Sequence, residues 1–160
     1  MIDRSEAINS FAESWQMIEQ LFEDYAKSVG FSAQSLETLE VLYAHPEGYT
    51  QKQIAADTHA SKQVTNLVIK DFWKKGLVEL HEIPEDRRLK LVQLTEDGKR
   101  IAADIIAPLW EDEVNGLMAI DQEKLPVFLE GFKQYAEYIK YKSVTQEKLG
   151  GETGFAQTED

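Results

Sequence analysis

Six side chains suited to hydrogen bonding with nucleic acid lie within ten residues of one another. They are polar or basic and share one segment with helical apolar spacing: Ser61, Lys62, Gln63, Thr65, Asn66 and Lys70. Hydroxyl, amide and ammonium groups bind base edges and phosphates. No acidic residue occurs in this segment before Asp71, although the formal net charge of the chain is −12. We therefore expect these six residues to contact the bases and phosphates of DNA.

A second candidate contact is the run Asp86-Arg87-Arg88, which follows Pro84 between two strand-like segments. Arginines at the tip of a thin ribbon can enter a minor groove, where the potential is strongly negative. The carboxylate of Asp86 can pair with the guanidinium of Arg88 and orient it. Each pattern alone is common in proteins that bind no DNA, but the two in this order are more specific.

Other chemistries find little support. The chain has no cysteine, which excludes disulfides, thiolate zinc sites and cysteine nucleophiles. Its histidines, His45, His59 and His81, have no mutual spacing of three or four residues, so we predict no metal site. A glycine-rich phosphate loop and a nucleophile elbow are also missing from the sequence. We predict that the protein is not an enzyme and needs no cofactor.

The charge is unevenly distributed. Residues 50–100 hold ten basic and eight acidic residues, a balance of +2, whereas the rest of the chain holds seven basic and 21 acidic residues, a balance of −14. Such asymmetry suggests two parts with different partners. No apolar run approaches the roughly 18–20 residues of a membrane span, and the N-terminus has no apolar signal core. We expect a cytoplasmic protein without a membrane partner.

Apolar periodicity predicts four helices in the first half of the chain. The first covers residues 5–28, is capped by Ser5 and carries an aromatic-rich stripe from Ile8 to Val29. The second covers 33–44 after Ser32. The third covers 51–58 and opens with a capping box formed by Thr50 and Gln53. The fourth follows Ser61 and ends before Gly76, with its inner face expected at Val64, Leu67, Val68, Ile69, Phe72 and Trp73.

The period then changes to that of strands. Residues 77–83 and 89–95 predict a hairpin, with 84–88 as its turn and Leu89, Leu91 and Gln93 on one face. Helices are expected again over 99–119, with a kink or break at Pro108, and over 122–142 after Asp121. If the last helix starts near Leu125, Pro126 takes a favoured early position.

Two short helices joined by a tight turn and followed by a hairpin describe a winged helix-turn-helix. The predicted fold class is mainly α with a small β-hairpin wing (α+β), with N- and C-terminal dimerisation helices. Residues 31–99 would form the DNA-binding domain, residues 1–30 and 100–145 the dimerisation region, and residues 146–160 a disordered acidic tail. The alternative function is a winged helix that binds protein instead of DNA, for which Arg87 and Arg88 would be dispensable.

Over residues 5–145 the chain resembles the MarR family of winged-helix regulators. The resemblance rests on Gly48–Ala55, on Ala60–Leu67 leading into Trp73–Val78, and on Asp86-Arg87-Arg88 followed by Val92–Gly98. It implies a homodimer that binds an inverted-repeat operator in double-stranded DNA, usually to repress transcription. It also implies that Arg88 is the minor-groove arginine with Asp86 as its partner. The residues implied to face the major groove are Lys62, Gln63, Thr65 and Asn66. Asn66 stands where many members carry arginine, which departs from the family pattern.

Members of the family commonly respond to small aromatic or lipophilic effectors. Four aromatic residues could line such a site: Phe11, Trp15, Tyr43 and Trp110. The alternative interpretation is that these rings belong to the core or to the dimer interface.

Overall fold

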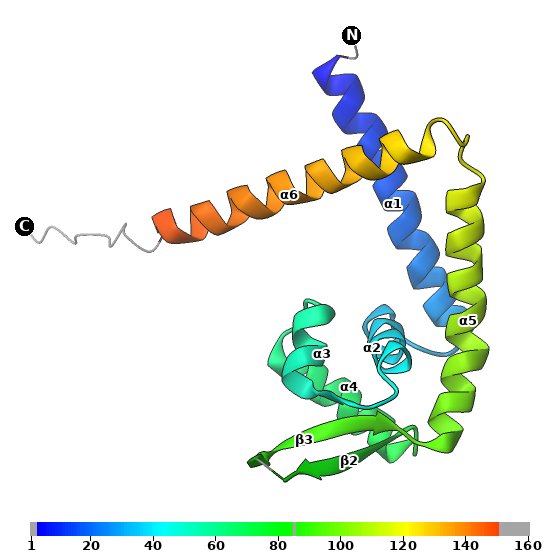
Figure 1. Cartoon of the computed structure of the whole chain (residues 1–160), viewed down its shortest axis with the longest axis vertical. Helices are drawn as coiled ribbons and strands as arrows, with labels where there is room; N and C mark the ends of the chain where they lie inside the picture. Colours follow the sequence, from blue (N-terminus) through cyan, green and yellow to red (C-terminus); the bar gives the residue numbers. More distant parts are fainter. Residues whose placement is uncertain (1–2, 85, 151–160) are drawn as a thin grey trace, which may run out of the picture. The chain divides into compact units, whose positions relative to one another are not determined.

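The computed structural model describes residues 3–84 and 86–150, and the side chains of residues 3–84 and 89–140. The chain divides into two compact units, Met1–Trp110 and Glu111–Asp160. The elements follow in the order α1 (Arg4–Ser28), α2 (Ala33–Ala44), β1 (Tyr49–Thr50), α3 (Gln51–Asp57), α4 (Lys62–Lys74), β2 (Val78–Ile83), β3 (Asp86–Leu94), α5 (Glu96–Met118) and α6 (Leu125–Gly150) (Figure 1).

Side-chain caps fix where the helices of the first unit begin. The hydroxyls of Ser32, Thr50 and Ser61 accept backbone hydrogen bonds at the starts of α2, α3 and α4, as predicted. Thr50 and Gln53 form the full capping box. The predicted cap of α1 is wrong: the carboxylate of Asp3 accepts from the Ser5 amide at 2.9 Å, so this helix begins at Arg4. Asp3 has the extended backbone of an N-cap, and its carboxylate also suits the positive end of the helix dipole.

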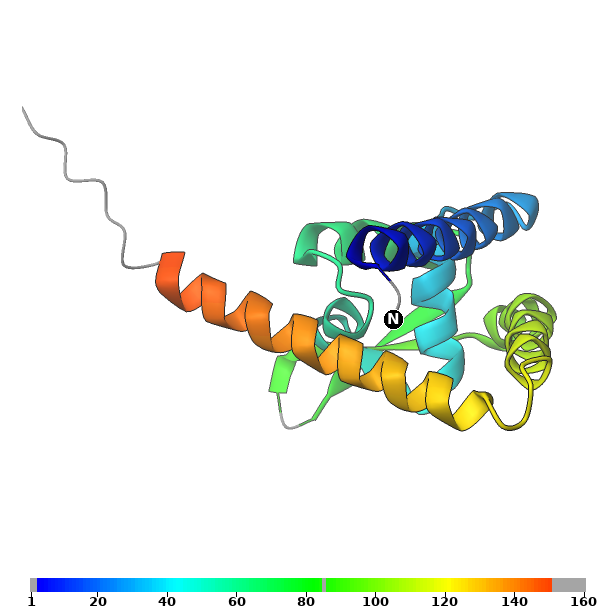
Figure 2. The same ribbon diagram turned by 90° about the horizontal axis from the view of Figure 1, so that it is seen from above.

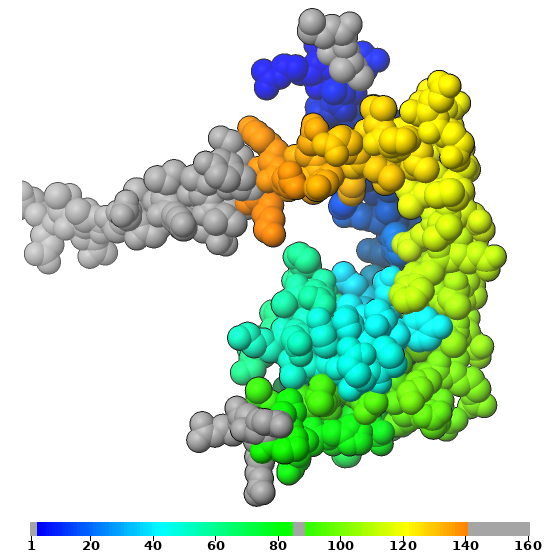
Figure 3. Space-filling model, viewed as in Figure 1, coloured from blue at the N-terminus to red at the C-terminus, as the bar shows by residue number. Residues whose placement is uncertain are grey.

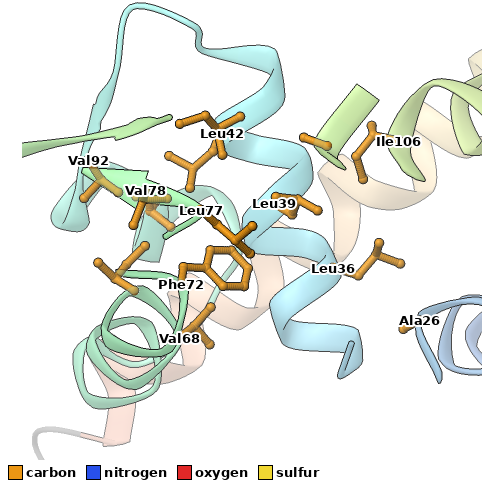
Figure 4. Packing of buried hydrophobic residues seen from close by; sticks show 14 of the residues in the cluster. Ala26, Leu36, Leu39, Leu42, Val68, Phe72, Leu77, Val78, Val92 and Ile106 are labelled. Carbon is orange, nitrogen blue, oxygen red and sulfur yellow. The ribbon is translucent and has the colours of Figure 1, made fainter. Parts of the chain in front are cut away.

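Helix α2 is the centre of the first unit (Figure 2), where it contacts α1, α3, α4 and β3. Its residues Leu36, Leu39 and Leu42 are almost fully buried. Around them the core takes side chains from every neighbouring element: Ala26, Ile54, Val68, Ile69, Phe72, Leu77, Val78, Val92, Leu94, Ala102, Ile106 and Leu109. Figure 4 shows part of this cluster, with Ala26 of α1, Phe72 of α4, Val92 of β3 and Ile106 of α5 among the labelled residues. The core therefore draws on α1 and α5 as well as on residues 31–99.

The sheet has the strand order β1-β3-β2, and both pairings are antiparallel. Val78 pairs with Leu94 and Leu80 with Val92. Val92 and Leu94 face the core, so the face with Leu89, Leu91 and Gln93 is the outer one. Strand β1 was not predicted, because two residues are too few to show an alternation.

Strand β3 begins at Asp86, within the segment that we predicted as a turn. Backbone pairing accounts for this earlier start of the strand, because Asp86 pairs with Ile83 of β2 and the register of the two strands shifts between Glu82 and Ile83. Pairing of this kind depends on backbone geometry and is compatible with the charged side chains that suggested a turn.

A compact junction joins the end of α4, the wing and the start of α5. Thr95 donates its amide to the Leu77 carbonyl at 3.0 Å and its hydroxyl to the Gly76 carbonyl at 2.7 Å. The same hydroxyl oxygen accepts from the Gly98 amide at 2.9 Å, which caps α5. Gly98 is packed so closely on Leu77 that a Cβ would overlap the Leu77 carbonyl group.

The aromatic stripe of α1 is most deeply buried near its C-terminal end. Ala26 is buried there, and Tyr25 donates its hydroxyl to the Ile105 carbonyl of α5 at 2.6 Å. In the N-terminal half, Ile8, Trp15 and Ile18 are 60%, 43% and 51% exposed. The C-terminal end of this apolar face therefore packs into the core of the first unit, whereas Ile8, Trp15 and Ile18 remain largely exposed to solvent.

Helix α5 runs through Pro108 without interruption, so a break at this residue is wrong. Proline removes one helical hydrogen bond, and burial of Ile106 and Leu109 on either side holds the helix together. Its start at Glu96 is three residues earlier than predicted.

In the second unit, Asp121 accepts from the Glu123 amide at 2.9 Å before α6 begins at Leu125. Pro126 therefore lies in the first turn, as the alternative prediction required. The helix extends to Gly150 and so includes the first five residues of the predicted tail. The other predicted tail residues, 151–160, lie outside the described part of the chain.

We predict that Gly98→Ala lowers the free energy of unfolding by about 1–3 kcal/mol, because the added methyl group meets backbone that cannot move aside. Denaturant unfolding at one fixed protein concentration measures the loss. Gly116→Ala, in the same helix but with open space at its Cβ, is the control and should be neutral or stabilising. Equal effects of the two substitutions would contradict the proposed junction.

Candidate nucleic-acid interface

Helix α4 buries one face and exposes the other. The buried residues are Thr65, Val68, Ile69 and Phe72, at helical spacings of three and four. Phe72 is fully buried between Leu77, Leu39 and Val68 (Figure 4) and meets the Phe31 ring edge to face at 5.9 Å. This packing fixes the rotation of α4 about its own axis.

The prediction that Thr65 faces outward is wrong. Its side chain is 1% exposed, and its hydroxyl donates to the Ser61 carbonyl at 3.1 Å. Threonine can replace an apolar residue here because its methyl group packs inward while its hydroxyl is satisfied within the helix. A sequence-based assignment that treats threonine as polar places Thr65 on the exposed face of α4. This error rotates the predicted buried face of the helix away from its true position.

The same error in the predicted rotation of α4 explains why three residues that we expected to be buried are exposed. Val64, Leu67 and Trp73 are 39%, 68% and 58% exposed. A helical wheel centred on Thr65 and Phe72 would have placed Leu67 on the outer face. The sequence therefore contained the signal, but the apolar character of leucine and tryptophan obscured it.

The other predicted residues of this segment are exposed: Ser61, Lys62, Gln63, Asn66 and Lys70. Gln63, Leu67 and Lys70 lie opposite the buried face, and Asn66 lies beside them. We call Gln63, Asn66, Leu67 and Lys70 the outer face of α4. Neither Lys62 nor Lys70 takes part in an ion pair within the described residues, so both ammonium groups remain available for phosphates.

Acidic charge near the end of α4 is neutralised. Asp71 and Lys75 form an ion pair at 2.7 Å, and the Lys75 ammonium also lies 5.8 Å from the centre of the Phe31 ring. The first acidic residue after Ser61 thus contributes little repulsion toward a polyanion.

The turn between α3 and α4 has a left-handed residue. His59 has φ +51°, and Ala60 donates its amide to the Ala55 carbonyl at 3.1 Å. The left-handed conformation costs a non-glycine residue about 1–2 kcal/mol, and the buried Thr58 helps to hold it.

Burial raises the pKa of Glu37 in α2, and the nearby His59 opposes this shift.

The turn between α2 and α3 is held by polar and stacking contacts. His45 stacks on Tyr49 with ring centres 3.9 Å apart, and its Nδ1 lies 3.2 Å from the Glu47 carboxylate. Hydrogen bonds from its own backbone amide and from His45 lower the pKa of Glu47. A hydrogen bond to Asp57 at the end of α3 raises the pKa of Tyr49. These contacts fix the start and end of α3 relative to α2.

The wing is formed by β2 and β3 at the lower edge of the first unit in Figure 3. The backbone of Asp86, Arg87 and Arg88 belongs to β3. The side chains of these three predicted contacts lie outside the described residues, so their pairing stays a prediction.

The four predicted effector residues form two pairs. Phe11 and Trp15 stack within α1 with ring centres 6.0 Å apart. Tyr43 of α2 and Trp110 of α5 are 5.2 Å apart, and the Trp110 indole donates to Glu40 at 2.6 Å. The second pair lies at the edge of the core, and the first lies on the largely exposed half of α1.

The described residues contain no group of three or more histidine, aspartate or glutamate side chains that could hold a metal ion. Among the described helices, none has the length and apolar character needed to cross a membrane.

Comparison with known proteins agrees with this geometry. The model of the MarR family matches residues 29–89, from the end of α1 to the start of β3. The chain is 28% identical over 104 residues to the uncharacterized HTH-type transcriptional regulator YdcH of Bacillus subtilis, covering 64% of this chain and 69% of that protein.

Two solved structures share the fold. AbsC, a MarR family transcriptional regulator from Streptomyces coelicolor, is 22% identical with a TM-score of 0.72, over 88% of this chain and 97% of that one. MepR of S. aureus, solved as a complex with DNA, is 19% identical with a TM-score of 0.69, over 81% and 97%. The match of the family model to residues 29–89 and the shared fold show that the chain is similar to MarR family winged-helix regulators, in sequence over the helix-turn-helix and in fold over most of its length.

Proposed function

We propose that the protein is a cytoplasmic homodimer that represses transcription by binding an inverted-repeat operator, and that a small aromatic or lipophilic effector controls it. In each subunit α4 would enter the major groove, and the wing arginines would reach the adjacent minor groove. Residues 31–99 would supply these contacts, and residues 1–30 and 100–145 would supply the dimer interface.

The observation that carries this proposal is the outer face of α4. Its lysine, Lys70, and the nearby Lys62 take part in no ion pair within the described residues, and Asp71, the only acidic residue of the helix, is paired with Lys75. Because the chain as a whole has a net charge of −12, a basic face whose one acidic neighbour is paired favours a polyanionic partner at this position.

Exposed apolar faces support the dimer. In α6 they recur at helical spacing along one face: Phe128, Leu129, Phe132, Tyr135 and Ile139, each 43–48% exposed. The N-terminal half of the α1 stripe is exposed in the same way. Apolar faces of this extent mark protein interfaces in soluble proteins, and a second copy of the chain would cover both.

The proposed effector site is the pair Tyr43 and Trp110. Their rings contact each other between α2 and α5, and both are only partly buried. Glu40 adds a polar group at the Trp110 indole. Aromatic surface with one polar anchor suits a small aromatic ligand, which would act on α2 and α5 together.

One observation favours a second candidate, a winged helix that binds protein. Leu67 and Trp73 are large, apolar and more than half exposed on α4, as is common in protein interfaces. The two candidates differ in the wing, because only DNA binding would require Arg87 and Arg88.

The first experiment is selection of bound genomic DNA fragments by the wild type and by an Arg87→Ala/Arg88→Ala variant. We expect the wild type to enrich an inverted repeat with half-sites about 10 base pairs apart, and the variant to lose or blur it. Dimer mass and circular dichroism of the variant serve as controls for folding. If the folded wild-type dimer enriches no sequence at low salt, the proposal of a DNA-binding repressor is overturned and the protein-binding alternative is favoured.

A second prediction concerns Lys70. If its ammonium contacts a phosphate, Lys70→Ala should reduce the slope of log K against log salt by about one per half-site, hence by about two for a dimer. Fluorescence anisotropy with one operator between 50 and 200 mM salt measures the slope. Lys27→Ala, which removes the same charge from an ion pair with Glu23 on α1, should leave the slope unchanged.

A third prediction tests the dimer. Phe132→Asp places a charge within the apolar face of α6 and should convert the dimer to monomer at micromolar concentration, because burial of the carboxylate is costly. Sedimentation equilibrium gives the mass. The control is Gln134→Asp, since Gln134 lies on the opposite side of α6. A Phe132→Asp protein that stays dimeric would exclude this face as the interface.

A further inference from the structure

The outer face of α4 contains two amides and a leucine in its N-terminal half. Gln63, Asn66 and Leu67 are all exposed, and Leu67 is 68% exposed. From this arrangement we infer that α4 reads an A·T-rich half-site: Gln63 and Asn66 bind adenines, and Leu67 contacts a thymine methyl group. The inference rests on the proposed function and specifies its DNA target.

The chemistry of the base edges supports this assignment. Adenine presents an acceptor at N7 and a donor at N6 in the major groove, and a carboxamide matches both. Thymine alone carries a methyl group there, and an apolar side chain is its natural contact. A leucine on a polar, DNA-facing surface exposes apolar area to water in the free protein, and contact with a methyl group would remove that area.

The spacing of these residues fits successive base pairs. Gln63 and Leu67 are one helical turn apart, about 6 Å along the axis, which corresponds to about two steps of 3.4 Å along the DNA. Asn66 is beside Leu67 at about the same height. The three side chains can therefore reach neighbouring base pairs within one half-site.

Guanine recognition has weaker support on α4. The helix contains no arginine, which is the commonest partner of guanine. Lys70 lies about 10 Å further along the axis than Gln63, away from the N-terminal half that contacts base edges. Lys62 lies about a quarter turn from Gln63, at the edge of the outer face. Both lysines are therefore better placed for phosphates.

The test begins with the operator found by fragment selection and uses thymine-to-uracil exchange, which deletes only the methyl group. With the wild type, exchange at one thymine of a half-site should weaken binding about fourfold, the value of one buried methyl-sized group. Leu67→Ala should bind more weakly but be indifferent to the exchange. Leu67→Met should keep the sensitivity, because an apolar side chain of similar volume remains.

The amides are tested on the same operator. Asn66→Ala should reduce selection for one adenine by roughly 5- to 150-fold and leave the other positions unchanged. For the thymine-to-uracil exchange, the control is uracil placed outside the half-sites, which should leave the affinity of the wild type unchanged.

The outcomes separate the inference from the proposed function. An inverted repeat with G·C-rich half-sites, or a Leu67→Ala protein as sensitive to uracil as the wild type, would overturn the inference but leave the repressor in place. If the folded dimer enriches no fragment, the proposed function fails and the inference falls with it.

Discussion

Burial of one side of α4 is the constraint on which the rest of the molecule depends. Thr65, Val68, Ile69 and Phe72 pack against α2 and the sheet, and this packing sets the rotation of the helix. The rotation in turn determines which side chains face outward. Any function assigned to α4 therefore follows from the core beneath it, and a substitution at Phe72 would change both stability and the presentation of Gln63.

Much of the fold could be predicted because local signals specify it. The caps at Ser32, Thr50 and Ser61 are short-range features of the chain, and glycine marks the end of α4. What could not be predicted depends on tertiary context. Strand β1 exists only because β3 offers it a ladder, and the start of β3 at Asp86 follows from pairing with Ile83.

The candidate site shows the same division. Exposure of Lys62, Gln63, Asn66 and Lys70 could be predicted, because polar side chains on a capped helix seldom point into a core. Thr65 and Leu67 exchanged their expected positions, since residue type favours the wrong side for each. Position along the helix determines burial here: Thr65 lies three residues before Val68 and seven before Phe72, so it faces α2 although threonine is polar. The phase of the helix was therefore the missing information.

The junction at Thr95 has a mechanical consequence. Thr95 binds the carbonyls of Gly76 and Leu77 while its hydroxyl caps α5, and Gly98 rests directly on Leu77. These contacts tie the end of α4 directly to the first turn of α5. A displacement of the first turn of α5 would therefore move the end of α4 with it.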